Sequence, residues 1–127
     1  ASSDFVRQLL SSSGKVAHVA EEQMHAVTAV SGSGPAYIFH FIECLTEAAR
    51  KAGLPDDIAR LLVMQTVYGA ASLADGSVDD PGTLREQVTS PNGTTQAALD
   101  VLMDGRLRKL VTEAVDAAMR RSIELGN

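Results

Sequence analysis

Apolar residues recur at helical spacing along most of the chain. From about Pro35 to Ala52 they follow the i, i+3, i+4, i+7 spacing of a helix with one buried face, and Gly53 stands just past its end. A second helix is expected from Pro55 to about Ala74, with acidic residues in its first turn. This segment has almost no polar face, and a helix that is apolar all round must be surrounded. The pattern therefore predicts a homodimer built around this helix.

The same spacing predicts further helices on either side of these two. They are expected at residues 21–30, 80–88, 94–104 and 107–125. Asp80 is the expected N-cap of the second of them, because its side chain can accept from the free N–H groups of the first turn. The run Ser31-Gly32-Ser33-Gly34-Pro35 interrupts the helical pattern and is expected to form a tight corner between two helices.

The start of the chain has a different pattern. Asp4 to Leu10 predicts a short helix that ends in a serine run before Gly14, and Lys15 to Ala20 alternates and predicts one short strand. Because a lone strand has nothing to pair with, this opening indicates either the tail of a larger α/β unit or a strand that pairs with another copy. We therefore divide the chain into such a tail, residues 1–20, and a helical domain, residues 21–127.

Composition and charge narrow the class of protein. The chain has 127 residues, 45% of them apolar, which suits one domain with its own core. Its net charge is -5 and its longest basic run is Arg120-Arg121, so nucleic acid is not an expected partner. The apolar segment from Leu61 to Ala74 is shorter than the about 20 residues that span a bilayer, so no membrane is expected either. A single cysteine, Cys44, excludes an intramolecular disulfide and favours a cytoplasmic location.

One turn has the features of a binding site for a small anion. Pro91-Asn92-Gly93 lies directly before the helix expected to begin at Thr94. There the backbone N–H groups of Gly93, Thr94 and Thr95 are expected to lack intrahelical partners, and the helix dipole makes them partly positive. Ser90 and the two threonines add hydroxyl groups, and Gly93 lets a ligand approach the backbone closely. The pattern alone also fits a turn that only caps the helix.

Other candidate chemistries have weaker support. The three histidines, His18, His25 and His40, have neither HExxH spacing nor a nearby cysteine pair, so no metal site is expected. The run from Ser31 to Gly34 is not a GxSxG nucleophile elbow, because Ser33 has glycine on both sides and no strand is expected before it. Nor is it a GxGxxG dinucleotide motif, because Tyr37 stands at the third glycine position.

Several separated blocks carry a family resemblance. They are residues 28–37, 65–66 with 69–71, 84–86, and 88–95. In order and spacing they resemble the C-terminal half of pyrroline-5-carboxylate reductase, over the chain from about Lys15 onward. Where that family usually has two glycines in the turn, Asn92 replaces the first. Asparagine tolerates left-handed backbone geometry, so the turn is expected to survive.

The resemblance implies an enzyme that transfers a hydride from NADPH or NADH to the C=N carbon of 1-pyrroline-5-carboxylate and so makes L-proline. It implies an all-α fold, an intertwined helical-bundle dimerisation domain similar to the C-terminal domain of 6-phosphogluconate dehydrogenase. Residues 1–20 would then be a short helix-strand remnant of the family's Rossmann domain, which binds the cofactor. The Gly-rich cofactor fingerprint is absent from the chain, so the chain alone is expected to be inactive. A homodimer or a higher oligomer of dimers is implied.

The resemblance also assigns roles to residues. It puts the substrate carboxylate on Ser90, Asn92, Gly93, Thr94 and Thr95. It identifies Thr95 as the catalytic residue, whose hydroxyl faces the ring nitrogen and either donates a proton or orients the imine. It puts the nicotinamide end of the cofactor near Ser31, Gly32 and Ser33.

Two other functions fit parts of the pattern. The first is a non-catalytic helical dimerisation module in which the threonine-rich turn is only a cap. The second is the helical domain of another nicotinamide-dependent reductase, which would carry a catalytic lysine in a central helix. Residues 61–74 contain no lysine. The ordered blocks favour the pyrroline-5-carboxylate reductase half over both.

Overall fold

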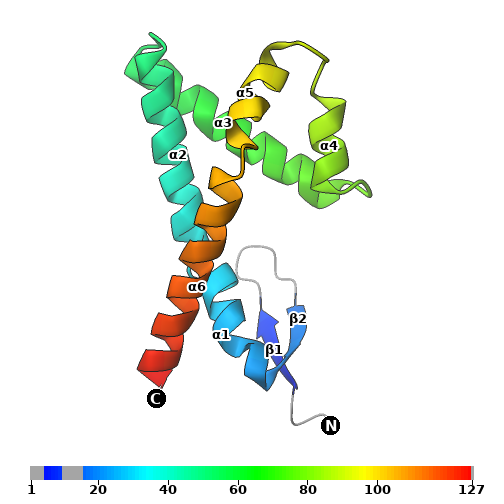
Figure 1. Ribbon diagram of the computed structural model, residues 1–127, viewed down its shortest axis with the longest axis vertical. Coiled ribbons are helices and arrows are strands. Elements are labelled where there is room, and N and C mark those ends of the chain that lie inside the picture. The colour runs from blue at the N-terminus through cyan, green and yellow to red at the C-terminus, as the bar shows by residue number, and fades with distance from the viewer. Residues whose placement is uncertain (1–4, 10–15, 127) are drawn as a thin grey trace. The chain divides into compact units, whose positions relative to one another are not determined.

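The chain folds as an all-α domain with one short β-hairpin at its start. The computed structural model describes residues 5–9 and 16–126 (Figure 1). It divides into two compact units. The first consists of Ala1–Tyr37 and Arg108–Asn127, and the second of Ile38–Leu107. The predicted division into residues 1–20 and 21–127 follows a different criterion and stays a prediction.

Two long helices dominate the second unit. They are α2, Gly34–Lys51, and α3, Asp56–Gly76. Gly53 ends α2 with φ 104°, in the left-handed region that glycine occupies without steric cost. The Gly53 N–H donates to the Arg50 carbonyl at 2.9 Å, so the end of the helix is closed by the backbone. Both helices were predicted, and the apolar spacing and flanking turn residues account for their positions.

Two shorter helices complete this unit. They are α4, Pro81–Gln87, and α5, Thr94–Leu102. The Asp80 carboxylate accepts a hydrogen bond from the Thr83 N–H at 2.9 Å, which confirms it as the N-cap of α4. Gly105, with φ 103°, lies between α5 and the last helix, as the sequence predicted.

The first unit contains the β-hairpin and helical segments from the N-terminal and C-terminal parts of the sequence. A 3-10 turn, η2, covers Glu21–Gln23, and α1 covers Met24–Val27. The last helix, α6, covers Arg106–Gly126. The His25 Nδ1 and the Ser122 Oγ are hydrogen-bonded at 2.7 Å, which links α1 to α6 across 97 positions of sequence.

The corner predicted at Ser31–Pro35 is replaced by a π-helix that begins before it and runs into α2. This segment, η3, covers Thr28–Gly32, and the next residue, Ser33, also has helical dihedral angles, φ −87° and ψ −20°. A proline inside an α-helix clashes with the carbonyl four residues earlier, which for Pro35 is that of Ser31. A wider turn relieves that crowding, so the chain continues into α2 through one extra residue rather than through a loop.

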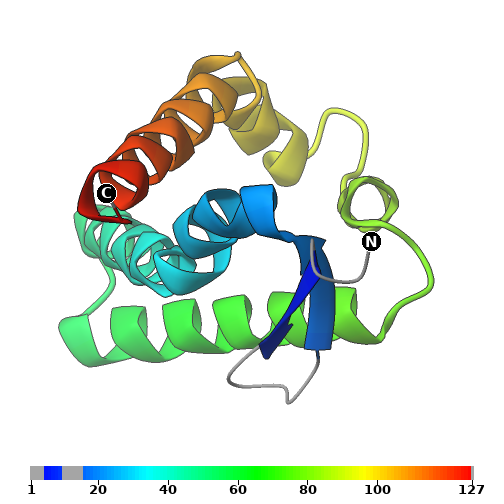
Figure 2. The same cartoon turned by 90° about the horizontal axis from the view of Figure 1, so that it is seen from below.

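The helix predicted from Asp4 to Leu10 is wrong over the residues that the structure describes. Residues 5–9 form strand β1, Phe5–Leu9, which pairs antiparallel with β2, Val16–Ala20 (Figure 2). The one strand that was predicted, at Lys15–Ala20, is confirmed as β2, and its partner lies in the same chain. A helix of this length is marginal in water, whereas Phe and Val suit a paired strand. Asp4, Leu10, Lys15 and the predicted break at residues 11–14 lie outside the described residues.

Few apolar side chains are buried within one copy of the chain. Among the described residues, the buried apolar ones are Ala29, Ala59 and Val63. The helix predicted to be apolar all round, α3, leaves large side chains exposed by about half: Leu61 57%, Leu62 49%, Met64 49% and Leu73 58%. Since monomeric proteins rarely expose contiguous apolar surface of this kind, the exposure indicates that α3 is covered by another molecule. None of the described helices has the length and apolar character that crossing a membrane requires.

Candidate functional site

The turn before α5 is held by its own backbone. The Gly93 N–H donates to the Ser90 carbonyl at 3.1 Å. Asn92 has φ 60° and is the single non-glycine residue of the described chain with a positive φ. The expectation that asparagine would keep the left-handed turn is therefore confirmed. Asparagine is among the few residues that enter this region without a large steric cost.

The turn requires glycine at position 93 because there is little room for a side chain, and not because of the backbone dihedral angles. Its φ of −89° and ψ of −174° are open to any residue. A β-carbon at this position would lie 3.2 Å from the Ser90 carbonyl oxygen and 3.4 Å from the Ser90 Cβ. The sequence predicted a glycine that admits a ligand. In the structure the group that approaches Gly93 closely is the backbone of the turn itself.

The first turn of α5 presents three backbone donors without acceptors. Gly93 is the N-cap and offers no side chain, and Ala97 is the first residue whose N–H donates within the helix, to the Gly93 carbonyl at 3.2 Å. The N–H groups of Thr94, Thr95 and Gln96 have no acceptor among the described residues. The dipole of the helix adds partial positive charge at the same place.

One member of the predicted donor set is engaged within the turn. The Gly93 N–H lacks an intrahelical partner, as predicted, but it donates to the Ser90 carbonyl. Gln96 supplies the third donor in its place. The sequence contained the signal for this residue, because the third position of any α-helix has an N–H without an intrahelical acceptor.

A comparison within the chain shows that the end of α5 is left uncapped. At α4, the Thr83 backbone N–H holds the pKa of the Asp80 carboxyl below its usual value, which is the signature of a side-chain cap. At α5 no side chain accepts from the first turn. The hydroxyls of Ser90, Thr94 and Thr95 make no hydrogen bond within the described part of the chain. The interpretation of this turn as an ordinary side-chain cap is therefore wrong.

The arrangement suits a small carboxylate or phosphate. Its three N–H groups can donate to the oxygens of one anion, and the free threonine hydroxyls can reach a second polar group of the same ligand. Thr95 is half-buried, whereas Ser90, Asn92 and Thr94 are exposed. Within the described residues, no group of three or more His, Cys, Asp or Glu side chains is arranged to hold a metal ion.

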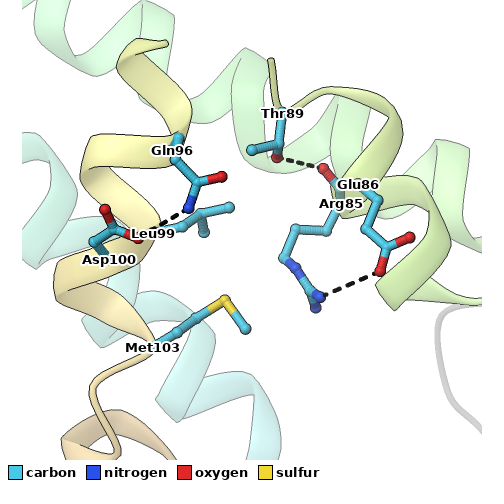
Figure 3. A pocket seen from close by; sticks show the side chains of 7 residues that line it. All are labelled: Arg85, Glu86, Thr89, Gln96, Leu99, Asp100 and Met103. Carbon is cyan, nitrogen blue, oxygen red and sulfur yellow. Dashed lines mark hydrogen bonds and ion pairs between the residues drawn. The ribbon is translucent and has the colours of Figure 1, made fainter. Parts of the chain in front are cut away.

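A pocket of about 350 Å³ lies beside this turn, between α4 and α5 (Figure 3). Its lining is Arg85, Glu86, Thr89, Gln96, Leu99, Asp100 and Met103. The polar groups are largely engaged with one another: the Gln96 amide donates to Asp100 at 2.9 Å, and the Thr89 hydroxyl donates to the Arg85 carbonyl at 2.6 Å. The sequence did not predict this pocket, because it depends on how two short helices pack.

The residues predicted for the nicotinamide end lie in the other compact unit. Ser31 and Gly32 belong to the π-helix, and Ser33 follows it. Ser31 and Ser33 are half-buried, and their hydroxyls make no hydrogen bond with any residue that the structure describes. Two such uncommitted hydroxyls fit a polar amide group of the kind that nicotinamide carries.

Comparison with known proteins decides the family. Residues 21–125 match the family model described as pyrroline-5-carboxylate reductase dimerisation. The chain belongs to this family. Its description agrees with the exposed apolar face of α3 and with the predicted homo-oligomer.

Curated relatives agree. A pyrroline-5-carboxylate reductase of Synechocystis sp. is 47% identical over 120 residues, which cover 94% of this chain and 45% of the relative. One of Pisum sativum is 46% identical over 122 residues, which cover 96% of this chain and 45% of the relative. The chain thus spans less than half the length of the curated relatives it matches.

Solved structures of the same family share the fold. A pyrroline carboxylate reductase of Plasmodium falciparum with NADP bound matches with a TM-score of 0.81 and 35% identity, over 86% of this chain and 44% of its own. A pyrroline-5-carboxylate reductase of Coxiella burnetii matches with a TM-score of 0.81 and 48% identity, over 84% of this chain and 40% of its own.

Proposed function

We propose that this chain is the substrate-binding and dimerisation half of an enzyme that reduces 1-pyrroline-5-carboxylate to L-proline. The observation that carries the proposal is the uncapped end of α5, where the N–H groups of Thr94, Thr95 and Gln96 point from a partly positive helix end. This helix end overlaps the Ser90–Thr95 segment, which is part of the sequence blocks that carry the family resemblance. The family match, residues 21–125, covers it.

The substrate carboxylate binds at this helix end. Its oxygens accept from the three N–H groups, while the turn closed between Gly93 and Ser90 keeps the donors in place. Asn92 holds the left-handed position on which that turn depends. Ser90 and Thr94 contribute hydroxyls at the rim. Binding through fixed backbone donors orients a rigid five-membered ring with little loss of side-chain entropy.

Thr95 is the catalytic residue, and its hydroxyl faces the ring nitrogen. A threonine hydroxyl is a poor acid, and an imine that arrives protonated needs no proton from the enzyme. Thr95 therefore orients the imine and hydrogen-bonds the product amine, so that the C=N carbon is presented for reduction. A relay of a proton from water through the same hydroxyl is the alternative role.

NADPH or NADH supplies the hydride when it is bound, and a Rossmann domain outside this chain holds most of it. The hydroxyls of Ser31 and Ser33, with Gly32 between them, hold the nicotinamide amide. Because the chain contributes only this end of the cofactor site, we expect it to be inactive alone.

A cytoplasmic location suits its single, exposed and unpaired cysteine, Cys44.

The functional molecule is a homodimer or an oligomer of dimers. The large side chains of α3 that one copy leaves exposed, Leu61, Leu62, Met64 and Leu73, are buried between copies. Each half-exposed side chain of this size stabilises the dimer by on the order of 1 kcal/mol when it is removed from water. A helix of 21 residues with such a face gives a dimer interface of useful stability.

An activity assay on the full-length protein tests this function. The full-length enzyme should oxidise NADPH or NADH only when 1-pyrroline-5-carboxylate is present, and the product should be L-proline by chromatography. This chain alone, as a matched control, should show no oxidation. A full-length protein that binds the cofactor but leaves this imine unchanged would overturn the proposal.

A further inference from the structure

The Tyr37 hydroxyl donates a hydrogen bond to the Ala29 carbonyl across the wide turn that precedes α2. The O···O distance is 2.7 Å, and Ala29 is fully buried, with 0% of its surface exposed. Residues 28–32 form the π-helix, after which the Ser33 N–H donates to the Thr28 carbonyl, five residues back, at 2.9 Å. Single π-turns inside helices are rare and frequently lie at functional sites.

This hydroxyl occupies the acceptor that the competing α-helical register would use. In an α-helix the Ser33 N–H would donate to the Ala29 carbonyl, four residues back. In the observed register it donates to Thr28 instead, and the Ala29 oxygen accepts from Tyr37. Because Ala29 is fully buried, no water can replace a lost donor there. The Tyr37 hydroxyl therefore favours the π register over the α register.

The register decides where the next side chains point. One residue of α-helix turns the chain by roughly 100°, so a change of register by one residue redirects the groups that follow it. Ser31 lies within this turn and Ser33 at its end, and their hydroxyls have no hydrogen-bond partner within the described residues. Pro35 favours the same register, since its ring would clash with the Ser31 carbonyl in a regular helix.

We propose that Tyr37 is a positioning residue for the nicotinamide cofactor. By holding the π-turn it keeps the Ser31 and Ser33 hydroxyls in the direction from which they meet the nicotinamide amide. This inference rests on the proposed function, which puts that end of the cofactor at Ser31–Ser33. Tyr37 touches no reacting atom and acts through the backbone of Ala29.

The test compares Tyr37→Phe with Tyr68→Phe in the full-length protein. Each variant loses one tyrosine hydroxyl. The hydroxyl of Tyr68, a residue that is 69% exposed, makes no hydrogen bond among the described residues. Fluorescence titration gives the dissociation constant of whichever cofactor the wild type binds more tightly. We expect Tyr37→Phe to raise it roughly threefold to tenfold, the effect of one lost hydrogen bond. The KM for the imine should stay within a factor of two, and Tyr68→Phe should change neither.

A crystal structure of Tyr37→Phe reads the register directly. The expected result is a Ser33 N–H bonded to the Ala29 carbonyl in place of Thr28. An unchanged π-turn with unchanged cofactor affinity would overturn the proposal. So would a variant that fails to fold, or one that loses affinity for cofactor and imine equally, since Tyr37 would then be only structural. A wild type that binds cofactor but does not reduce the imine would overturn the proposed function and leave this test intact.

Discussion

Gly93 and Ser90 are joined backbone to backbone, with the Gly93 N–H donating to the Ser90 carbonyl at 3.1 Å. This bond closes the turn over Asn92 and fixes the direction in which α5 begins. It also engages one of the three N–H groups predicted to lack intrahelical partners, and it leaves the next three N–H groups for a ligand. The Gly93 N–H thus holds the turn, whereas those of Thr94, Thr95 and Gln96 hold the substrate.

Thr95→Ala in the full-length enzyme should lower turnover by roughly 10²-fold to 10⁴-fold, because it removes the hydroxyl that orients the imine or relays its proton. Thr95→Ser is the matched control and should keep most of the turnover, because the hydroxyl remains. Steady-state kinetics separates the two roles. A raised KM with unchanged turnover would leave Thr95 only a binding role.

Asn92→Gly should be nearly neutral, because glycine adopts a φ of 60° without cost. Asn92→Ala should lower the free energy of unfolding by about 1–2 kcal/mol, since alanine lacks the side chain that makes this region accessible to asparagine. Urea unfolding of both variants gives the difference. Equal stability of the alanine variant would mean that the turn relaxes to another conformation.

Gly93→Ala should raise the KM for the imine more than it lowers stability. The added β-carbon would meet the Ser90 carbonyl oxygen at 3.2 Å, and that oxygen is backbone, so the turn must shift by a few tenths of an ångström to admit it. Gly76→Ala is the control, because a β-carbon there meets no atom within 4 Å. If both variants bind the imine as the wild type does, the turn does not position the donors.

Leu62→Glu should convert the dimer to a monomer. Leu62 is 49% exposed on the apolar surface of α3, and a carboxylate buried between copies without a partner is strongly unfavourable. Leu62→Met keeps an apolar side chain of similar size and should leave the dimer intact. Sedimentation equilibrium measures both masses. A Leu62→Glu variant that remains dimeric would place the interface elsewhere.

Asp80 should make the stability of α4 depend on pH at the acid end. The Thr83 N–H lowers the pKa of the folded carboxyl, so the stabilisation is present above the unfolded pKa and is lost as the pH falls through the lower, folded value. The loss is expected below about pH 4. Asp80→Asn keeps a capping side chain without the titration, so its melting temperature should fall less steeply over this range. If the melting temperatures of the wild type and of Asp80→Asn fall equally steeply with pH, Asp80 is not the source of this pH dependence.

The helices could be predicted because their signals are local. Apolar spacing fixed the extent of α2 and α3, and the residues at their ends, such as Gly53 and Asp80, act on neighbours within a few positions. The left-handed Asn92 was predictable for the same reason, since the backbone preference of asparagine belongs to the residue itself.

Features that depend on contacts distant in sequence, or on competition between two registers, were not predictable. Strand β1 exists because it pairs with β2, and the apolar spacing of residues 5–9 alone also fits a short amphipathic helix. The π-turn depends on the bond between Tyr37 and Ala29, which the spacing of the neighbouring glycines does not predict. Gln96 was not predicted as a donor because its contribution is a backbone N–H, which its side chain does not reveal, whereas its neighbours carry hydroxyls.

A crystal structure of the full-length protein with L-proline and the nicotinamide cofactor tests the central claim most directly. The predicted result is a proline carboxylate within hydrogen-bond distance of the backbone nitrogens of Thr94, Thr95 and Gln96, with the ring nitrogen facing the Thr95 hydroxyl. A carboxylate held by other groups, with these three N–H groups facing only water, would contradict it.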